Sequence, residues 1–129
     1  MPRRRSPMVD EGFRIAVASS DGVVVNKHFG KSRVFRIYRV DENEEVHFEE
    51  ERYVTPVCEG GEHDEERLDH NLLQIADCSY LLVARIGSEA YLRAERYGIQ
   101  SFELPGLIEE SVDRLIKFIK IQNLFTKKG

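Results

Sequence analysis

The segment that most constrains the fold is residues 13–18, FRIAVA, in which apolar side chains occupy both faces of a predicted strand. Ile15 and Val17 lie on one face, and the small residues Ala16 and Ala18 lie on the other. A strand that is apolar on both faces is typical of the centre of a sheet that helices cover on each side. The sequence therefore predicts an α/β fold with this segment as an inner strand.

The remaining pattern places strands first and then alternates strands with helices. Acidic residues open the first predicted helix, where they suit the positive end of its dipole, and Gly98 follows the second helix as a C-terminal glycine commonly does. This order predicts a mixed sheet of about five strands flanked by helices. Further strands are predicted at 23–25, 34–40, 46–54, 79–84 and 99–104, and helices at 64–76, 89–97 and 108–123.

The chain length of 129 residues fits one domain, which we expect at 12–124. A basic tail at 1–11 is expected to be disordered, and a tail at 125–129 is expected to be frayed. No apolar run reaches the ~20 residues that span a bilayer, and none follows Arg3–Arg5 as a secretion signal requires. Two cysteines in such a chain indicate reduced thiols, so we expect a cytoplasmic protein with no membrane association.

Acidic side chains are concentrated in residues 41–69, which hold 13 of the 23 Asp and Glu residues. One interpretation is a solvated hairpin edge at 44–51, where charge discourages pairing with another strand. The other is an electropositive pocket for an anionic ligand elsewhere on the domain. The N-terminal arginines have no interleaved aromatic residues, so specific nucleic-acid binding is not expected.

Two predicted loops contain the side chains that are best suited to bind a ligand. The first contains V-N-K-H-F-G at 25–30, and Gly30 allows the backbone beside His28 conformations that other residues avoid. His28 is therefore expected on a loop at the end of the sheet, braced by Phe29. The second loop, T-P-V-C-E-G-G-E-H at 55–63, is rich in proline and glycine and cannot form regular structure.

Two parts of the sequence resemble one family. The first is the motif V-N-K-H-F-G with the strand after it, and the second is the later run A-D-C-S-Y-L-L-V-A-R-I-G, which is followed by a helix and Y-G-I. This is the dinitrogenase iron–molybdenum cofactor biosynthesis family, which includes NifX-type carriers and the C-terminal domain of NifB-type proteins. The resemblance covers roughly residues 13–122. It implies a ribonuclease-H-like arrangement, in which three antiparallel strands are followed by parallel ones.

The resemblance also implies a non-catalytic protein that holds or transfers an iron–sulfur or iron–molybdenum type cluster between donor and acceptor proteins. Such a cluster is anionic and has open coordination positions, so a carrier needs one or two metal ligands and several hydrogen-bond donors. His28 and Cys58 are the expected metal ligands, and His63 is a further candidate for the cofactor site. The backbone amides of Gly87 and Ser88, which open a predicted helix, could meet the negative charge. Lys27, Lys31, Arg33 and Arg85 could assist.

Each candidate also has a purely structural interpretation. His28 could cap a turn, and Cys58 could be an ordinary loop thiol. Cys78 directly precedes a buried strand, where a free cysteine behaves as a small hydrophobic residue. His47 and His70 are expected on the surface.

Other classes of function fit the sequence less well. A zinc site at Cys58, His63, His28 and one further ligand is the main alternative, together with a protein-interaction module of the same fold that has no cluster role. A nuclease would need several carboxylates around two metal ions, and the first strand offers none. The segment R-I-G-S lacks a full phosphate-binding fingerprint, and nothing marks a third residue that would orient a Cys58–His28 nucleophile pair. The sequence leaves the oligomeric state open.

Overall fold

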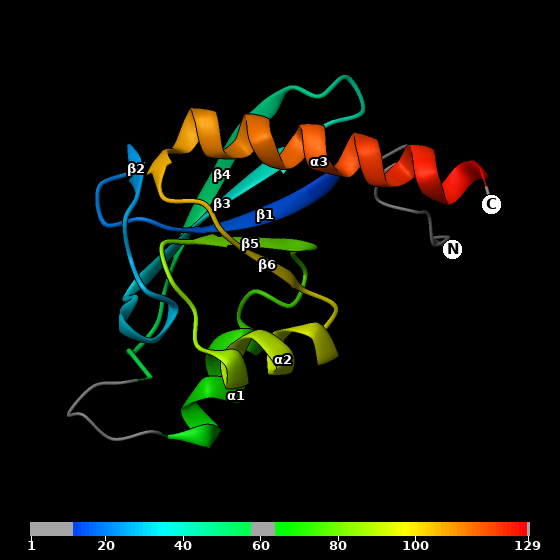
Figure 1. The fold of residues 1–129 in the computed structure, drawn as a ribbon. Coiled ribbons are helices and arrows are strands. Elements are labelled where there is room, and N and C mark those ends of the chain that lie inside the picture. The colour runs from blue at the N-terminus through cyan, green and yellow to red at the C-terminus, as the bar shows by residue number, and fades with distance from the viewer. Residues whose placement is uncertain (1–11, 58–63, 129) are drawn as a thin grey trace, which may run out of the picture.

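The computed structural model describes residues 12–57 and 64–128 and contains a five-stranded main sheet (Figure 1). The spatial order of its strands is β4-β3-β1-β5-β6. β1 pairs antiparallel with β3 and parallel with β5, while β4 extends the antiparallel side and β6 extends the parallel side. The predicted mixed sheet, with antiparallel strands first and parallel strands later, is therefore confirmed. The strands are β1 (Phe13–Ala18), β3 (Val34–Val40), β4 (Val46–Tyr53), β5 (Tyr80–Val83) and β6 (Gln100–Glu103).

Helices cover both faces of this sheet, as Figure 1 shows. α1 (Glu65–Leu73) and α2 (Ser88–Arg96) pack on one face, and α3 (Ile108–Lys128) packs on the other. Within the described part of the chain, no helix is both long and apolar enough to cross a membrane.

The inner position of β1 is visible in its burial. Ala16 and Ala18 are fully buried in the core beneath α1 and α2, whereas Ile15 and Val17 are fully buried beneath α3. Small side chains on one face let the two helices approach the sheet closely, and larger ones fill the space under the single helix. The predicted central strand is confirmed.

A second, two-stranded sheet holds the start of α3. β2 (Val24–Val25) pairs antiparallel with β7 (Gly106–Leu107), and the Val23 carbonyl accepts a hydrogen bond of 2.9 Å from the Ile108 amide. The sequence predicted a strand at 23–25 but none at 106–107. Gly106 has a φ of 127°, a conformation that favours glycine and lets the chain turn from β6 into this short pairing.

Two helix boundaries differ from the prediction. α1 ends at Leu73 rather than at residue 76, because the following turns bond three residues back and bury Ile75. α3 continues to Lys128, beyond the predicted end at 123, since no proline or glycine interrupts it before Gly129. Its backbone is thus helical at 125–128, where a frayed tail was expected. The expected tail at 1–11 lies outside the described residues.

Replacing Leu115 by alanine tests the seating of α3 on the sheet. Leu115 is fully buried, so Leu115→Ala should lower the free energy of unfolding by about 2–5 kcal/mol through lost burial and a residual cavity. Urea denaturation measures this change. The matched control is Leu92→Ala on α2, where a side chain that is 57% exposed should change stability by no more than about 0.5 kcal/mol. Equal losses in the two variants would contradict the packing of α3.

Candidate functional site

A hollow of about 440 Å³ lies where the loop that follows β2 meets the end of β5 and the start of α2. Its lining combines an apolar wall with polar and charged groups. The apolar members are Phe29, Val57, Leu68, Ile86 and Ala90, and the others are His28, Gly30, Lys31, Arg85, Gly87 and Glu89. The hollow therefore brings together the two segments in which the sequence predicted His28 and Gly87 as site residues.

The backbone at His28 is held by β5 and by its own turn. His28 forms a parallel bridge with Arg85, the Phe29 amide donates to the Arg85 carbonyl at 2.9 Å, and the Ala84 amide donates to the Lys27 carbonyl at 2.9 Å. The His28 carbonyl also accepts from the Lys31 amide at 3.1 Å and from the buried Ser32 hydroxyl at 2.9 Å. The imidazole is exposed although its backbone is fixed, which is a suitable arrangement for a ligand to a group from solution.

Phe29 anchors this loop in the core, as predicted. Its side chain is buried, and its ring lies 5.6 Å from the ring of Phe35 on β3, centroid to centroid. Phe29 also begins the short 3₁₀ turn η1 (Phe29–Lys31). Burying a phenylalanine contributes on the order of 1.5–3 kcal/mol, so the residue beside the histidine fixes the loop position.

The start of α2 contributes the positive end of a helix to the hollow. Gly87 precedes the helix as its N-cap and brings no side chain that could cap the first amide groups. Gly87, Glu89 and Ala90 line the hollow. Ser88 is exposed at the first helical position but is not among the residues that line the hollow, whereas Gly87 is.

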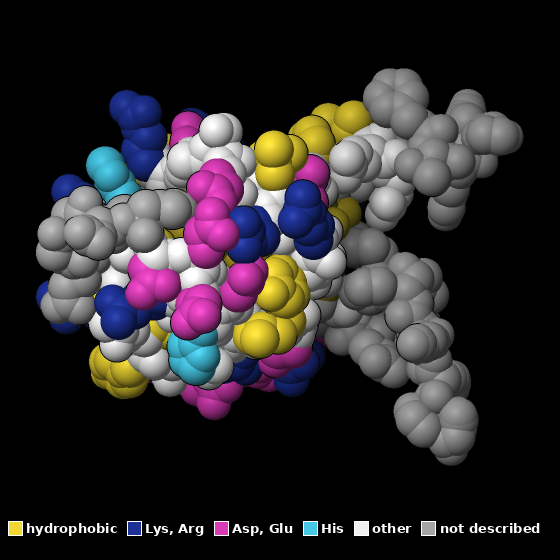
Figure 2. All heavy atoms as spheres, turned by 90° about the horizontal axis from the view of Figure 1, so that it is seen from below, with side chains coloured by type: hydrophobic (Ala, Val, Ile, Leu, Met, Phe, Trp, Pro, Cys, Tyr) yellow, Lys and Arg dark blue, Asp and Glu magenta, His cyan; other side chains and the backbone are white. Residues whose placement is uncertain are grey.

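The charges around the hollow are unequal. Lys31 and Arg85 both line it, and no described carboxylate pairs with either side chain. Among the described lining residues only Glu89 is acidic, and it lies 3.1 Å from Arg93 on the next turn of α2. Figure 2 looks onto the face covered by α1 and α2, where Asp and Glu side chains form a band across the middle and Lys and Arg side chains lie along the left edge and beside that band. The hollow thus has a positive excess that suits an anion.

A contact that the sequence analysis missed fixes the loop between β5 and α2. The Ile86 amide donates a 2.9 Å hydrogen bond to the carboxylate of Glu103, the last residue of β6. Parallel pairing of Val83 with Glu103 brings the two segments together. Sequence periodicity carries no signal for such a contact, because it depends on which strands are neighbours.

The predicted ligands Cys58 and His63 lie outside the described residues. Val57, which directly precedes Cys58 in the sequence, is buried and lines the hollow. The other cysteine, Cys78, is buried as predicted, and burial raises the pKa of its thiol to about 12. Cys78 therefore remains protonated at neutral pH, and it is not among the residues that line the hollow.

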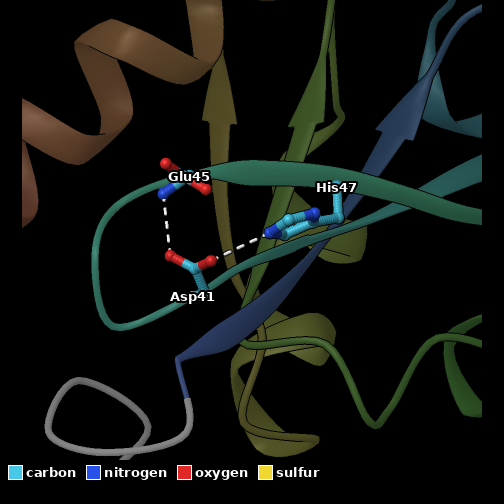
Figure 3. Close-up of side chains that lie close together, drawn as sticks. All are labelled: Asp41, Glu45 and His47. Atoms are coloured by element: carbon cyan, nitrogen blue, oxygen red, sulfur yellow. Dashed lines mark hydrogen bonds and ion pairs between the residues drawn. The ribbon is translucent and has the colours of Figure 1, made fainter.

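A separate group of possible metal ligands lies at the turn between β3 and β4. One ligand atom each from Asp41, Glu45 and His47 lies within 4.8 Å of the other two (Figure 3). The Asp41 carboxylate already accepts from the amides of Asn43 and Glu45, at 2.8 and 2.9 Å, and lies 2.9 Å from His47 Nε2. The hydrogen bond with His47 is the main reason that the pKa of Asp41 is lowered. These contacts close the hairpin turn and account for the cluster.

His70 also lies where the sequence predicted. It is exposed on α1, away from the buried Leu68 and Leu72. Neither His47 nor His70 is among the residues that line the hollow.

Comparisons with known proteins agree with the family resemblance that the sequence motifs indicated. The model of the family described as dinitrogenase iron-molybdenum cofactor matches residues 12–118. Protein NifY of Klebsiella pneumoniae is 33% identical over 98 residues, which are 76% of this chain and 39% of that protein. The FeMo cofactor biosynthesis protein NifB of Chlorobaculum tepidum is 32% identical over 98 residues, which are 76% of this chain and 22% of NifB. The chain thus spans less than half the length of these relatives.

Solved structures show the same fold at lower identity. PH0822 superposes with a TM-score of 0.57 and 22% identity, covering 81% of this chain and 90% of that chain. The Thermotoga protein TM1290, solved by NMR, superposes with a TM-score of 0.55 and 17% identity, covering 81% and 88%.

Alkylation of Cys78 tests its burial. In a Cys58→Ser variant, which leaves Cys78 as the only cysteine, iodoacetamide at about pH 8 should leave the folded protein unmodified, because roughly one thiol in ten thousand is ionised there. Mass spectrometry measures the modification. Guanidinium chloride should make the thiol reactive, and labelling of the folded protein at the rate of a free cysteine peptide would contradict the assignment.

Hydrogen exchange of the Ile86 amide tests the contact with Glu103. Glu103→Ala removes the acceptor and should speed exchange about fivefold, as expected for one hydrogen bond. Glu103→Gln keeps an oxygen acceptor and should stay close to the wild type. NMR measures the rate, and identical rates in the three proteins would show that the contact does not hold the loop.

Proposed function

Because the chain belongs to the dinitrogenase iron–molybdenum cofactor family, we propose that it binds and passes on a preformed iron–sulfur or iron–molybdenum type cluster without catalysing a reaction on it. The observation that carries this proposal is the exposed His28, whose backbone is fixed at the rim of a positively biased hollow. The family match supplies the class of ligand, and the hollow supplies the chemistry that would hold it.

The hollow meets the requirements of such a cargo in size and charge. Its volume of about 440 Å³ lies within the range of about 300–1,000 Å³ that is common for ligand pockets. Lys31, Arg85 and the amide groups at the start of α2 would offset the charge of an anionic cluster. The apolar wall lowers the local dielectric constant and so strengthens these attractions.

In this proposal the imidazole of His28 coordinates a metal atom of the cluster. Cys58 is the proposed second metal ligand, because the chain reaches the hollow at Val57, its neighbour in the sequence. His63 is a further candidate, and the amides at Gly87 and Ser88 are the proposed donors to sulfide or oxygen atoms. Two ligands leave a cluster exchangeable, whereas a complete cage of four would retain it.

The proposed partners are proteins that donate the cluster and proteins that accept it, and the proposed location is the cytoplasm. The printed name of NifB refers to FeMo cofactor biosynthesis, which supports a cofactor role, but NifB and NifY are both longer than this chain. We also propose that the sheet is of the ribonuclease-H-like type, which the antiparallel β4, β3 and β1 followed by parallel β5 and β6 support.

Anaerobic reconstitution tests the cargo. The protein is incubated with iron and sulfide, or with an isolated molybdenum–iron–sulfur cluster, and desalted, and its visible absorption is recorded. The wild type should retain colour. His28→Ala and Cys58→Ala should each weaken retention by at least roughly tenfold, because each removes a proposed metal ligand.

The matched control is His70→Ala, which removes an exposed histidine outside the hollow and should retain the cluster as the wild type does. Equal retention by His28→Ala and the wild type would contradict the role of His28. A wild type that stays colourless but holds stoichiometric zinc would favour the zinc-binding alternative.

A further inference from the structure

The face of the sheet that carries α3 has an uncovered margin. β4 is the edge strand, and its register with β3 places Val46 opposite Val40 and Phe48 opposite Tyr38, on the side of the sheet that faces α3. Val46 is nevertheless 44% exposed and Phe48 is 54% exposed. A groove of about 570 Å³ runs between these strands and the first turns of α3.

The two walls of this groove are apolar. Phe48 packs edge-on against Tyr38, with ring centroids 5.5 Å apart, and forms the wall on the sheet. On the other side, Val23, which directly precedes β2, is 56% exposed, and Leu107 of β7 is 45% exposed. Exposed apolar side chains that converge on one concave surface mark an interaction site more often than scattered ones do.

The charges of the groove have one sign. Its charged lining residues are Glu44, Glu109 and Asp113, and in the described part of the chain no basic residue lines it. Glu44 and Asp113 pair with Lys120 and Lys117 at 3.2 and 3.1 Å, but both lysines are well exposed, and exposed pairs of this kind contribute little to stability. An incoming basic group can therefore replace them.

We propose that this groove docks a segment of a partner protein in which apolar side chains are flanked by lysine or arginine. The apolar side chains would fill the space between Phe48 and Leu107, and the basic groups would meet Glu44, Glu109 and Asp113. A second copy of this chain is not the expected occupant, because two facing grooves would place carboxylates against carboxylates. The groove lies on the α3 face and the His28 hollow on the face of α1 and α2, so the inference does not depend on the proposed cluster role.

A leucine–lysine peptide serves as the probe. Its leucines follow the i, i+3, i+4, i+7 spacing of an amphipathic helix, and fluorescence anisotropy measures its binding to the full chain. Binding should be saturable and should weaken with salt. Phe48→Ser and Leu107→Ser should each weaken it by about tenfold, the loss expected for one large apolar contact, and Glu109→Gln should reduce the salt dependence.

Matched controls come from α2, on the opposite face. Leu92→Ser and Glu95→Gln remove an exposed leucine and an exposed carboxylate there, and both should bind the peptide as the wild type does. Urea denaturation of each variant confirms that it is folded. The amide chemical shifts that the peptide changes should lie at residues 46–48 and 107–113 rather than at 88–96.

Several outcomes would overturn the proposal. The first is that the peptide does not bind saturably. The second is that the Phe48→Ser and Leu107→Ser variants bind it as tightly as the wild type does. The third is that a peptide with glutamate in place of lysine binds as tightly as the leucine–lysine peptide. A dimer in sedimentation velocity that Phe48→Ser abolishes would identify a second copy as the occupant. Tighter peptide binding after Arg3→Gln, Arg4→Gln and Arg5→Gln are combined would identify the chain's own N-terminal segment instead.

Discussion

The pairing of β1 with a parallel neighbour on one side and an antiparallel neighbour on the other is the constraint from which the site follows. β1 and β5 run in the same direction, so their carboxyl ends lie at one edge of the sheet. The Ala18 carbonyl at the end of β1 accepts from the amides of Asn26 and Lys27, each at 3.3 Å. The Lys27 carbonyl then accepts from Ala84 beyond β5. This chain of hydrogen bonds carries His28 to Arg85, although 57 residues separate them in the sequence.

Much of the fold could be predicted because burial leaves a periodic trace in the sequence. Apolar residues alternate along 34–40, and the structure places Phe35 and Ile37 on one face of the sheet and Tyr38 and Val40 on the other. The apolar run of β5 correctly indicated a buried parallel strand. Periodicity gave no signal for β7 or for its pairing with β2, because two-residue strands are too short to show it and the two partners are about 80 residues apart.

The candidate site was predictable to the level of its loops and not of its contacts. The residue types at His28 and Gly87 and their places after strands indicated that they belong together, and the structure brings them to one hollow. The Glu103 contact depends on strand order, and the apolar wall depends on how α1 packs, so neither has a local signature. The predicted approach of Cys58 to His28 lies outside the described residues and stays a prediction.

The architecture of the hollow explains how a carrier of the proposed kind can hold a cluster and still release it. Coordination by an imidazole acts over a bond length and requires a ligand in a fixed position. The hydrogen bond from the Phe29 amide to the Arg85 carbonyl and the one from the Ser32 hydroxyl to the His28 carbonyl fix the backbone around His28. Attraction to Lys31 and Arg85 acts over a Debye length of about 8–10 Å at ordinary ionic strength and does not require a fixed geometry. The positive charges can therefore attract an anionic cluster before any metal bond forms. Positive charge on an acceptor protein would offset this attraction. In this proposal few metal bonds hold the cluster, and the rest of its binding energy comes from electrostatic attraction. An acceptor protein with its own positive charge can therefore compete for the cluster, so the retention of the cluster depends on the acceptor as well as on the carrier.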